Sequence, residues 1–226
     1  PTSFGGRDAY IEQLKVQLDS SDPKLLLFPS ELAEFCTDAA TKRGVDARDW
    51  ESLQSVVSAD VALPHSQPDD IAYLQYSSGS TRFPHGVAVT HHSVLALFDQ
   101  WLDRFGATPG EATSAWSSIG FDASVHELLL PLTTGAVLHV VPEDVRPDPA
   151  ALMAWLRDHR VVQAFLPPAY VRWADEDPAR LHGLALRQLL TGVEPLPEAA
   201  LARFAAALPG LRVRDHGQQL EVDAVV

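Results

Sequence analysis

Short apolar runs recur along the chain and are separated by longer stretches in which apolar and polar residues alternate with helical spacing. Runs of this length are typical of buried strands, because they are too short for a helix that crosses a domain. Their boundaries are marked by proline and glycine, which end regular structure. The pattern predicts strands at residues 25–28, 71–76, 136–141, 161–166, 186–191 and 211–213.

The segments between these runs carry helical periodicity. We expect helices at residues 30–42, 50–57, 92–104, 149–159 and 197–208. Strands that alternate with helices of this length are the signature of βαβ units, in which neighbouring strands are parallel. The sequence therefore predicts an α/β fold with layered helices and mostly parallel sheets.

A stretch of small hydroxylated residues around one glycine follows the predicted strand at 71–76. It contains Ser77, Ser78, Gly79, Ser80 and Thr81, and continues to Gly86. Such a turn leaves backbone N–H groups uncovered and adds hydroxyl donors, so it can cradle a phosphate. Runs of serine and glycine are also common in plain flexible loops. The residues alone leave both interpretations open.

A second stretch, residues 116–127, contains an aspartate, Asp122, and precedes the apolar segment at residues 128–132. Asp122 can cap the helix that follows it, which is a common role for aspartate. Its carboxylate can also lie in a pocket of low dielectric, where it needs a cationic partner such as an amine. Both roles are compatible with the sequence.

The composition limits the possible partners. The chain has 226 residues and a formal net charge of −13, with 46% hydrophobic residues. This length suits one large domain or two small ones, and a proline-containing linker suggests a subdivision into residues 1–63 and 64–226. Because the charge is acidic and no basic cluster offsets it, we expect neither nucleic acid nor a membrane surface as a partner.

Cysteine and histidine usage points to a cytoplasmic protein without a metal site. Cys36 is the single cysteine, so no intramolecular disulfide is possible, which fits a reducing compartment. No signal-peptide pattern and no apolar run of about 18 residues are found. His91 and His92 are adjacent, and adjacent side chains on a helix do not face the same point, so we expect no metal there.

The hydroxyl-rich stretch resembles the phosphate loop of the adenylate-forming superfamily, which includes peptide-synthetase adenylation domains and fatty-acyl-AMP ligases. The family pattern is Tyr-Thr-Ser-Gly-Ser/Thr-Thr-Gly-x-Pro-Lys-Gly-Val. The resemblance implies ATP and Mg²⁺, with the phosphates held by residues 77–81 and Gly86. Arg82 stands where the family has glycine, and His85 stands where it has lysine. The fixed cation of the loop is thereby replaced by a residue that is mostly neutral at pH 7.

The stretch around Asp122 resembles the substrate-pocket motif of nonribosomal peptide synthetases, Phe-Asp-x-Ser-x-x-Glu. The resemblance implies that Asp122 pairs with the α-ammonium of the substrate. It also implies a pocket formed by Phe121, Asp122, Ala123, His126, Phe165, Leu190 and Gly192. The turn of Gly192, Val193, Glu194 and Pro195 is similar to the family turn that lies along the adenine, where glycine permits close approach.

The resemblance weakens at both ends. Residues 1–10 resemble the fatty-acyl-AMP ligase branch, where this motif falls well inside the fold. Near the other end the family has Asn-x-Tyr-Gly-Pro-Thr-Glu, whereas His216, Gln219 and Leu220 replace its tyrosine, threonine and glutamate here. The lysine-bearing C-terminal domain of the family has no counterpart in the chain, so no catalytic residue is assigned.

Two functional hypotheses follow from the resemblance. In the first, the chain is part of an ATP-dependent carboxylate-activating domain of a peptide synthetase or a related assembly line, and is not competent alone. Its partners would be an amino acid or acyl substrate, a carrier protein and neighbouring synthetase domains. In the second, the chain is a degenerate pseudo-adenylation domain that serves as a scaffold or docking surface. The missing family segments also fit a piece of a longer, active parent.

Overall fold

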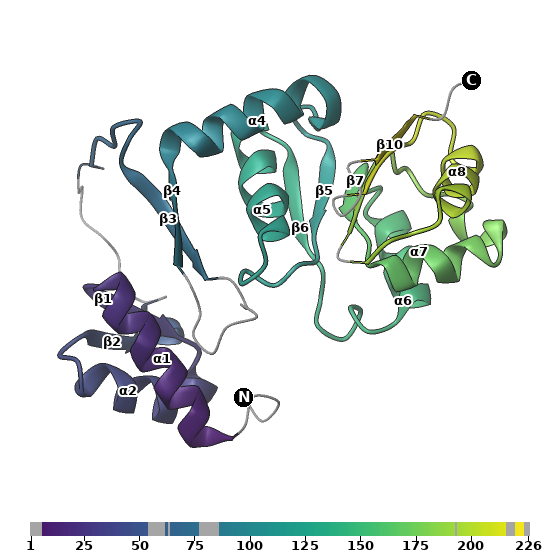
Figure 1. Cartoon of the computed structure of the whole chain (residues 1–226). Coiled ribbons are helices and arrows are strands. Elements are labelled where there is room, and N and C mark those ends of the chain that lie inside the picture. Colours follow the sequence, from purple (N-terminus) through teal and green to yellow (C-terminus); the bar gives the residue numbers. More distant parts are fainter. Residues whose placement is uncertain are drawn as a thin grey trace. The chain divides into compact units, whose positions relative to one another are not determined.

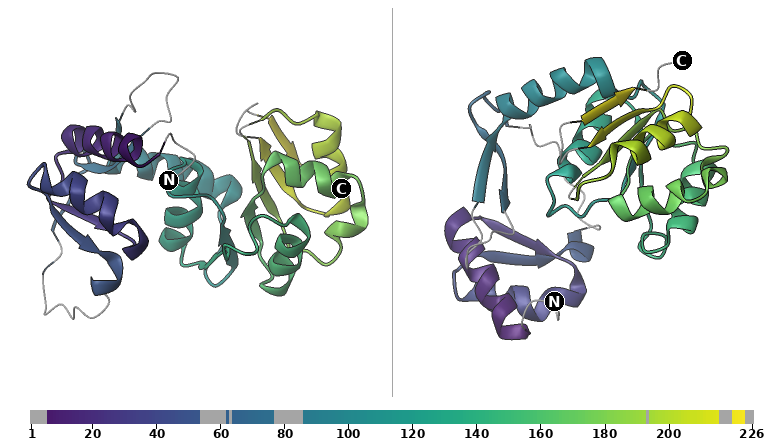
Figure 2. Two further views of the ribbon diagram at one scale, coloured as in Figure 1. Left: turned by 90° about the horizontal axis from the view of Figure 1, so that it is seen from below. Right: turned by 45° about the vertical axis from the view of Figure 1, so that its right-hand side comes forward.

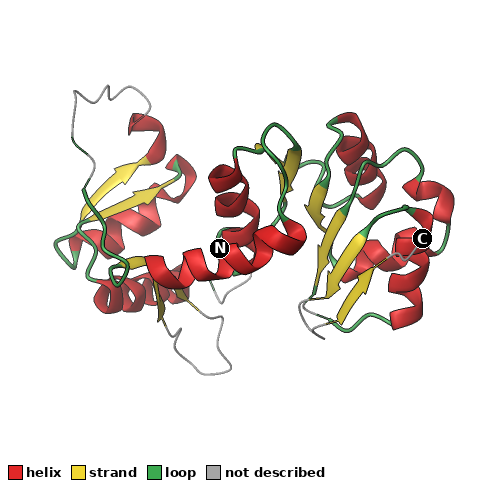
Figure 3. Ribbon diagram, turned by 90° about the horizontal axis from the view of Figure 1, so that it is seen from above, coloured by secondary structure: helices red, strands yellow, loops and turns green. Residues whose placement is uncertain are grey.

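The computed structural model describes residues 6–53, 62, 64–76, 86–192, 194–215 and 220–223. The chain forms two compact units, residues 1–94 and 95–226, and each is described by itself (Figure 1). Within each unit, strands and helices alternate along the chain (Figure 3). The α/β class and the mostly parallel pairing predicted from the apolar runs are confirmed. The subdivision at residues 63 and 64 stays a prediction.

The first unit contains one parallel βαβ motif. Strand β1 (Leu25–Phe28) pairs in parallel with β2 (Asp46–Asp49). The connection runs through a short 3₁₀ helix, η2 (Ser30–Leu32), and helix α2 (Ala33–Thr41). Helix α1 (Arg7–Ser21) packs on α2 and buries Ile11, Leu18 and Ala39 in a small core. Helix α3 (Trp50–Leu53) follows, and the rest of the predicted helix at 50–57 lies outside the described residues.

A second pair of strands in this unit flanks the hydroxyl-rich stretch. Strand β3 (Ile71–Tyr76) is antiparallel to β4 (Gly86–Thr90), and Tyr76 lies opposite Gly86. The Tyr76 hydroxyl bonds to the backbone oxygen of Gln17 at 3.1 Å and to the Ser20 hydroxyl at 2.5 Å. These bonds fasten the end of β3 to helix α1.

The second unit is built on a six-stranded sheet in the order β10-β9-β8-β7-β5-β6. Every neighbouring pair is parallel except β9 and β10, which are antiparallel. The strands are β5 (Ala112–Ala115), β6 (Val137–Val140), β7 (Gln163–Phe165), β8 (Gln188–Thr191), β9 (Arg212–Asp215) and β10 (Leu220–Asp223).

Helices supply the crossovers that parallel strands require. Helix α4 (His91–Phe105) leads into the sheet, and the crossover elements are α5 (Ala123–Thr134), α6 (Pro149–Asp158), α7 (Pro168–Asp175), the 3₁₀ helix η3 (Pro178–Leu181) and α8 (Glu198–Ala207). Helices α7 and α8 pack on one another beside the strands at one end of the sheet (Figure 2). Among the described residues, no helix is long and apolar enough to span a bilayer.

The two faces of this sheet differ in chemistry. Alternate residues of the central strands, such as Ala164, Leu189 and Val213, pack with apolar side chains of α6, α7 and α8 in one continuous core. Complete burial of a leucine or phenylalanine contributes about 1.5–3 kcal/mol, so this face supplies much of the stability. On the other face, Gln163 lies opposite Gln188 and Phe165 lies opposite Leu190. Helix α5 packs against β5, β6 and β7.

Four strands, β2, β4, β5 and β10, were not predicted from the apolar runs. Strand β5 consists of two alanines, a threonine and a serine, and β2 consists mainly of charged residues. Neither carries an apolar run, and each becomes a strand because it pairs with a neighbour. Strand formation depends strongly on such tertiary pairing. Strand β10 lies in the segment that departs from the family pattern.

Candidate functional site

The carboxyl ends of the parallel strands in the second unit form the candidate site. Strands β5, β7 and β8 end at Ala115, Phe165 and Thr191. Open α/β sheets bind their ligands at this edge, where the loops after the strands gather. The predicted pocket residues all lie on these loops, on the last residues of the strands or on the first turn of α5.

Asp122 forms the N-cap of helix α5. Its side-chain oxygen Oδ1 accepts a hydrogen bond from the backbone N–H of Ala123 at 2.8 Å. The capping role that the sequence left open is therefore present. The carboxylate is nevertheless exposed, as is the neighbouring Phe121, whose side chain is 59% accessible. A carboxylate that is both fixed by a cap and accessible can still receive a cation.

Glu127 fastens helix α5 to the end of strand β5. Its two carboxylate oxygens accept hydrogen bonds from the backbone N–H groups of Trp116 and Ser117, each at 2.9 Å. The side chain is buried, and burial raises the pKa of Glu127, while the bonds from Ser117 and Trp116 oppose this shift. Both ends of the loop that carries Asp122 are thus held in place.

Our sequence analysis assigned Glu127 no role. It is the last residue of the motif Phe-Asp-x-Ser-x-x-Glu. The sequence contains one signal for a structural role of Glu127, which is a single acidic residue at the start of the apolar segment of α5. A carboxylate that is buried in such a segment needs hydrogen-bond donors. The two donors lie ten and eleven residues earlier in the chain, in a loop whose path the sequence does not specify.

His126 lies one helical turn below Ala123 and is buried. Its ring lies 4.2 Å from the ring of Trp101, measured between centroids, at a tilt of 50°. The side-chain nitrogen of Gln163 lies 3.5 Å from each of the two ring nitrogens of His126. The structure therefore brings together His126 from α5 and Gln163 from β7, a contact that the sequence did not indicate.

Phe165 and Leu190 share the same face of the sheet, at its carboxyl edge. They lie opposite each other in the register of β7 and β8, and both are buried. The Phe165 ring stacks on Trp116 with a centroid distance of 6.0 Å and an interplanar angle of 30°. Two predicted pocket residues are thus neighbours on adjacent strands, next to the loop that leads to Asp122.

The turn after β8 is fixed by an ion pair. Gly192 is buried, whereas Glu194 and Pro195 are exposed, and Val193 lies outside the described residues. The Glu194 carboxylate receives a hydrogen bond from the Arg172 guanidinium of α7 at 3.0 Å. The position of this turn at the end of a parallel strand suits a flat ligand, and its contact with adenine stays a prediction.

The predicted phosphate loop belongs to the first unit. Ser77, Ser78, Gly79, Ser80 and Thr81 lie outside the described residues, so their role stays a prediction. Gly86, where the description resumes, approaches the Tyr76 ring closely. A Cβ atom built on Gly86 would lie 3.2 Å from the nearest ring carbon.

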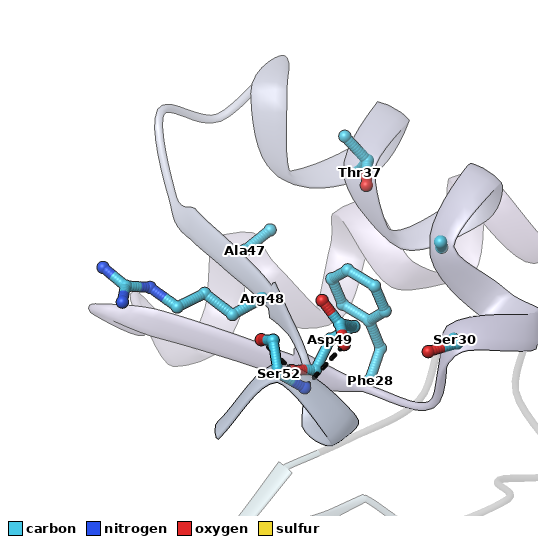
Figure 4. Close-up of a pocket in the computed structure, with 8 residues that line it drawn as sticks. Phe28, Ser30, Thr37, Ala47, Arg48, Asp49 and Ser52 are labelled. Carbon is cyan, nitrogen blue, oxygen red and sulfur yellow. Dashed lines mark hydrogen bonds between the residues drawn. The ribbon is translucent and has the colours of Figure 1, made fainter. Parts of the chain in front are cut away.

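The first unit also contains a pocket of about 520 Å³ at the carboxyl ends of β1 and β2 (Figure 4). Its polar groups already have partners in the protein. The Asp49 carboxylate accepts a hydrogen bond from the Ser52 N–H at 2.8 Å, and Ser30 donates from its N–H and its hydroxyl to Glu51. The pocket is lined by Phe28, Ser30, Ala33, Thr37, Ala47, Arg48, Asp49 and Ser52.

The described part of the chain contains no group of three histidine, cysteine, aspartate or glutamate side chains arranged to hold a metal ion. The lysines of the chain, Lys15, Lys24 and Lys42, all belong to the first unit, whereas the candidate site at the carboxyl edge of the six-stranded sheet belongs to the second unit.

The fold places the protein in the class of open, mostly parallel α/β sheets, which bind ligands at the carboxyl edge, and comparisons with known proteins identify the family. The AMP-binding enzyme family matches residues 8–217. The chain therefore belongs to the AMP-binding enzyme family, and the resemblance inferred from the two motifs is confirmed.

Among the relatives of this chain are a synthase and a carrier-protein ligase. Syringomycin synthase SyrB1 of Pseudomonas syringae pv. syringae is 36% identical over 197 residues, which cover 84% of this chain and 31% of that protein. An L-proline–[L-prolyl-carrier protein] ligase of Pseudomonas fluorescens is 34% identical over 166 residues, which cover 73% of this chain and 33% of that protein. The chain thus spans about a third of the length of these relatives.

Solved structures show the same fold. The fatty acyl-adenylate ligases from E. coli and L. pneumophila match with a TM-score of 0.75 and 26% identity, over 93% of this chain and 41% of that chain. The nonribosomal peptide synthetase FmoA3 matches with a TM-score of 0.72 and 27% identity, over 90% of this chain and 22% of that chain. Both branches that the sequence motifs indicated are therefore present among the structural neighbours.

Proposed function

We propose that this chain is part of an ATP-dependent domain that activates an amino acid as its adenylate for a carrier protein of a peptide-synthesising assembly line. The observation that carries the proposal is the position of Asp122. Its carboxylate is exposed at the carboxyl edge of a parallel sheet, is held by its bond to Ala123, and adjoins a loop fixed by Glu127. An α-ammonium group is a cation of suitable size for that carboxylate.

Each part of the chain has a distinct task in this proposal. Asp122 binds the ammonium group and orients the substrate carboxylate, while Phe165 and Leu190 contact the substrate side chain. Residues 77–81 and Gly86 hold phosphates, and the turn from Gly192 to Pro195 lies along the adenine. ATP supplies the adenylyl group that the substrate carboxylate receives, and pyrophosphate leaves.

ATP and Mg²⁺ enter this proposal through the family. Gly86, at the end of the predicted phosphate loop, lies close to Tyr76, and a Cβ atom there would be 3.2 Å from the nearest ring carbon. No described group of side chains is arranged to ligate a metal, and we derive no step from Mg²⁺. The similarity to syringomycin synthase SyrB1 and to the prolyl-carrier protein ligase supports a synthetase context and a carrier protein as partner. A free, buried Cys36 supports a reducing compartment such as the cytoplasm.

Amino-acid-dependent exchange of pyrophosphate into ATP tests this proposal. We expect the full-length protein that contains this chain to catalyse exchange with at least one α-amino acid, and we expect Asp122→Asn to abolish the preference for the acid that bears an amine. Asn is a good N-cap, so this variant removes the charge and preserves the helix start. Absence of exchange with all the α-amino acids tested would instead favour the pseudo-adenylation scaffold, in which the chain has no catalytic role.

A further inference from the structure

Two columns of side chains extend from the carboxyl edge of the sheet toward its interior. One column lies on helix α5, and the other lies on strand β7. On α5, His126 lies three residues after Ala123, close to one turn, which is a rise of about 4.5 Å along the helix. On β7, Gln163 lies two residues before Phe165, a distance of about 6.6 Å. Because the helix runs antiparallel to the strand, both columns descend together, and His126 meets Gln163 at the lower end.

The amide of Gln163 is buried and only weakly held. Its side chain is 3% accessible, and its nitrogen lies 3.5 Å from both ring nitrogens of His126. A donor equally distant from two ring nitrogens cannot point along the lone pair of either, and 3.5 Å is at the limit for a hydrogen bond. The amide oxygen of Gln163 has no hydrogen-bond partner in the described part of the chain.

This deficit concerns the amide oxygen, which can only accept a hydrogen bond. In the structure its nitrogen faces His126, and the oxygen is left without a donor among the described residues. A buried amide that lacks a partner destabilises a protein, whereas an apolar side chain of the same size would not. The residue is therefore better explained by a polar group that arrives with a ligand.

Gln188 provides a comparison within the same sheet. It lies directly opposite Gln163 in the register of β7 and β8, and its amide oxygen also lacks a partner among the described residues. Its nitrogen, however, donates to the backbone oxygen of Gly106 at 3.3 Å. Gln188 is thus occupied with the backbone of its own unit, whereas Gln163 lies beneath the predicted pocket residues Phe165 and His126.

We propose that Gln163 is a specificity-determining residue, which selects an uncharged polar amino acid as the substrate of this protein. The inference rests on the proposed function. With the α-ammonium group at Asp122, the substrate side chain descends between the two columns and passes Phe165. Its end reaches Gln163 about one helical turn below the ammonium site, which suits a side chain of glutamine length that ends in an amide or hydroxyl.

Matched pairs of amino acids test this proposal on the full-length protein. The pairs are glutamine with methionine, asparagine with leucine, and threonine with valine, which differ mainly in polarity. Binding is measured by calorimetry without ATP, and turnover by pyrophosphate exchange. We expect the polar member of the best-bound pair to bind at least about tenfold more tightly, because the apolar member leaves the Gln163 amide unpaired.

Variants of the two glutamines assign the preference to one residue. Gln163→Met is expected to abolish or reverse the preference within that pair, and Gln188→Met is expected to leave the ratio unchanged. Gln163→Glu, which retains size and polarity, is expected to shift binding toward lysine or ornithine. This second variant keeps the test decisive if Gln163→Met does not fold.

The outcomes separate this inference from the proposed function. If no amino acid supports exchange but calorimetry shows a polar preference that depends on Gln163, the proposed activity fails and the selectivity of Gln163 stands. If the apolar member binds better, if the Gln163 variants leave the ratio unchanged, or if no amino acid of the panel binds, the inference is overturned.

Discussion

The ring of Tyr76 occupies the space that a side chain at Gly86 would need. The two residues lie opposite each other at the end of the β3–β4 ladder, where the stretch 77–85 begins and ends. The ring cannot easily withdraw, because its hydroxyl is bonded to Ser20 and to the backbone of Gln17. A side chain at residue 86 would crowd this ring, so packing favours glycine there in addition to any contact with phosphate.

This relationship predicts the effect of a side chain at residue 86. Gly86→Val is expected to lower the free energy of unfolding by about 1–3 kcal/mol, because the added carbons overpack against the Tyr76 ring. Urea unfolding measures the effect. Ala88→Val is the matched control: Ala88 lies two residues further along β4 and is exposed, so valine there is expected to be neutral or slightly stabilising. Equal stability of the two variants would contradict the prediction.

Removal of the Glu127 carboxylate is expected to destabilise the second unit. Glu127→Ala leaves the buried N–H of Ser117 and the part-buried N–H of Trp116 without this acceptor, and a buried group without a partner costs about 1–3 kcal/mol. Because the Trp116 group is only part-buried, we expect a total loss of about 2–4 kcal/mol in urea unfolding. Glu127→Gln retains one acceptor oxygen and is expected to lose less. If Glu127→Ala lowered the free energy of unfolding by less than about 0.5 kcal/mol, as an ordinary exposed substitution does, Glu127 would not hold helix α5 to the end of β5.

The raised pKa of Glu127 predicts a pH dependence of known sign. Burial raises the folded-state pKa above its ordinary value of 4.5, so the folded protein binds the proton more tightly than the unfolded chain. The stability that this proton contributes is fully present below about pH 4.5, and it is lost as the pH rises through the folded-state pKa of Glu127. The stability of the wild type relative to Glu127→Gln should therefore fall over this range. A constant difference between the two would overturn the assignment.

Two substitutions of Asp122 separate its cap from its charge. Asp122→Ala removes the hydrogen bond to the Ala123 N–H and is expected to cost about 0.5–1 kcal/mol, at the lower end for N-caps, because only the first N–H of the helix is bonded. Asp122→Asn is expected to retain the stability. Both variants should lose the preference for amine-bearing acids in an exchange assay. If Asp122→Asn kept that preference, the residue would be a cap alone.

The contact between α7 and α8 contains a bidentate ion pair whose effect depends on pH. Arg203 donates to both oxygens of Asp175 at 2.7 Å, and this guanidinium lowers the pKa of Asp175 below its ordinary value of 3.8. The stability that this ion pair gives to the folded state is present above about pH 3.8, and it is lost as the pH falls through the folded-state pKa of Asp175.

Because Arg203 is exposed, Arg203→Lys is expected to lower the melting temperature at neutral pH by only about 1–2 °C. The difference should shrink with added salt and disappear at acid pH. A loss that persists at low pH would indicate packing by the arginine stem instead.

Sequence reasoning succeeded where a local pattern decided the outcome. The apolar runs at 25–28 and 71–76 became β1 and β3, and most of the run at 186–191 became β8, whose four residues are all buried. The helix that follows Asp122 was also expected. The family could be inferred because its two motifs are contiguous in the chain.

The remaining features depend on contacts between distant residues. Strand β5 has no apolar run, and its place between β6 and β7 is decided by pairing partners more than twenty residues away. The contact of His126 with Gln163 joins residues separated by 37 positions. Such pairings follow from the register of a sheet, and a single sequence does not specify that register.

The unequal faces of the six-stranded sheet have a consequence for the history of such domains. The apolar core lies against α6, α7 and α8, whereas Gln163, Phe165 and Leu190 project from the other side of the same strands. Substitutions on that side leave the core residues that pack against α6, α7 and α8 unchanged. If the proposed function holds, a duplicated copy of the domain could select a different amino acid after a few such substitutions, while its scaffold is inherited.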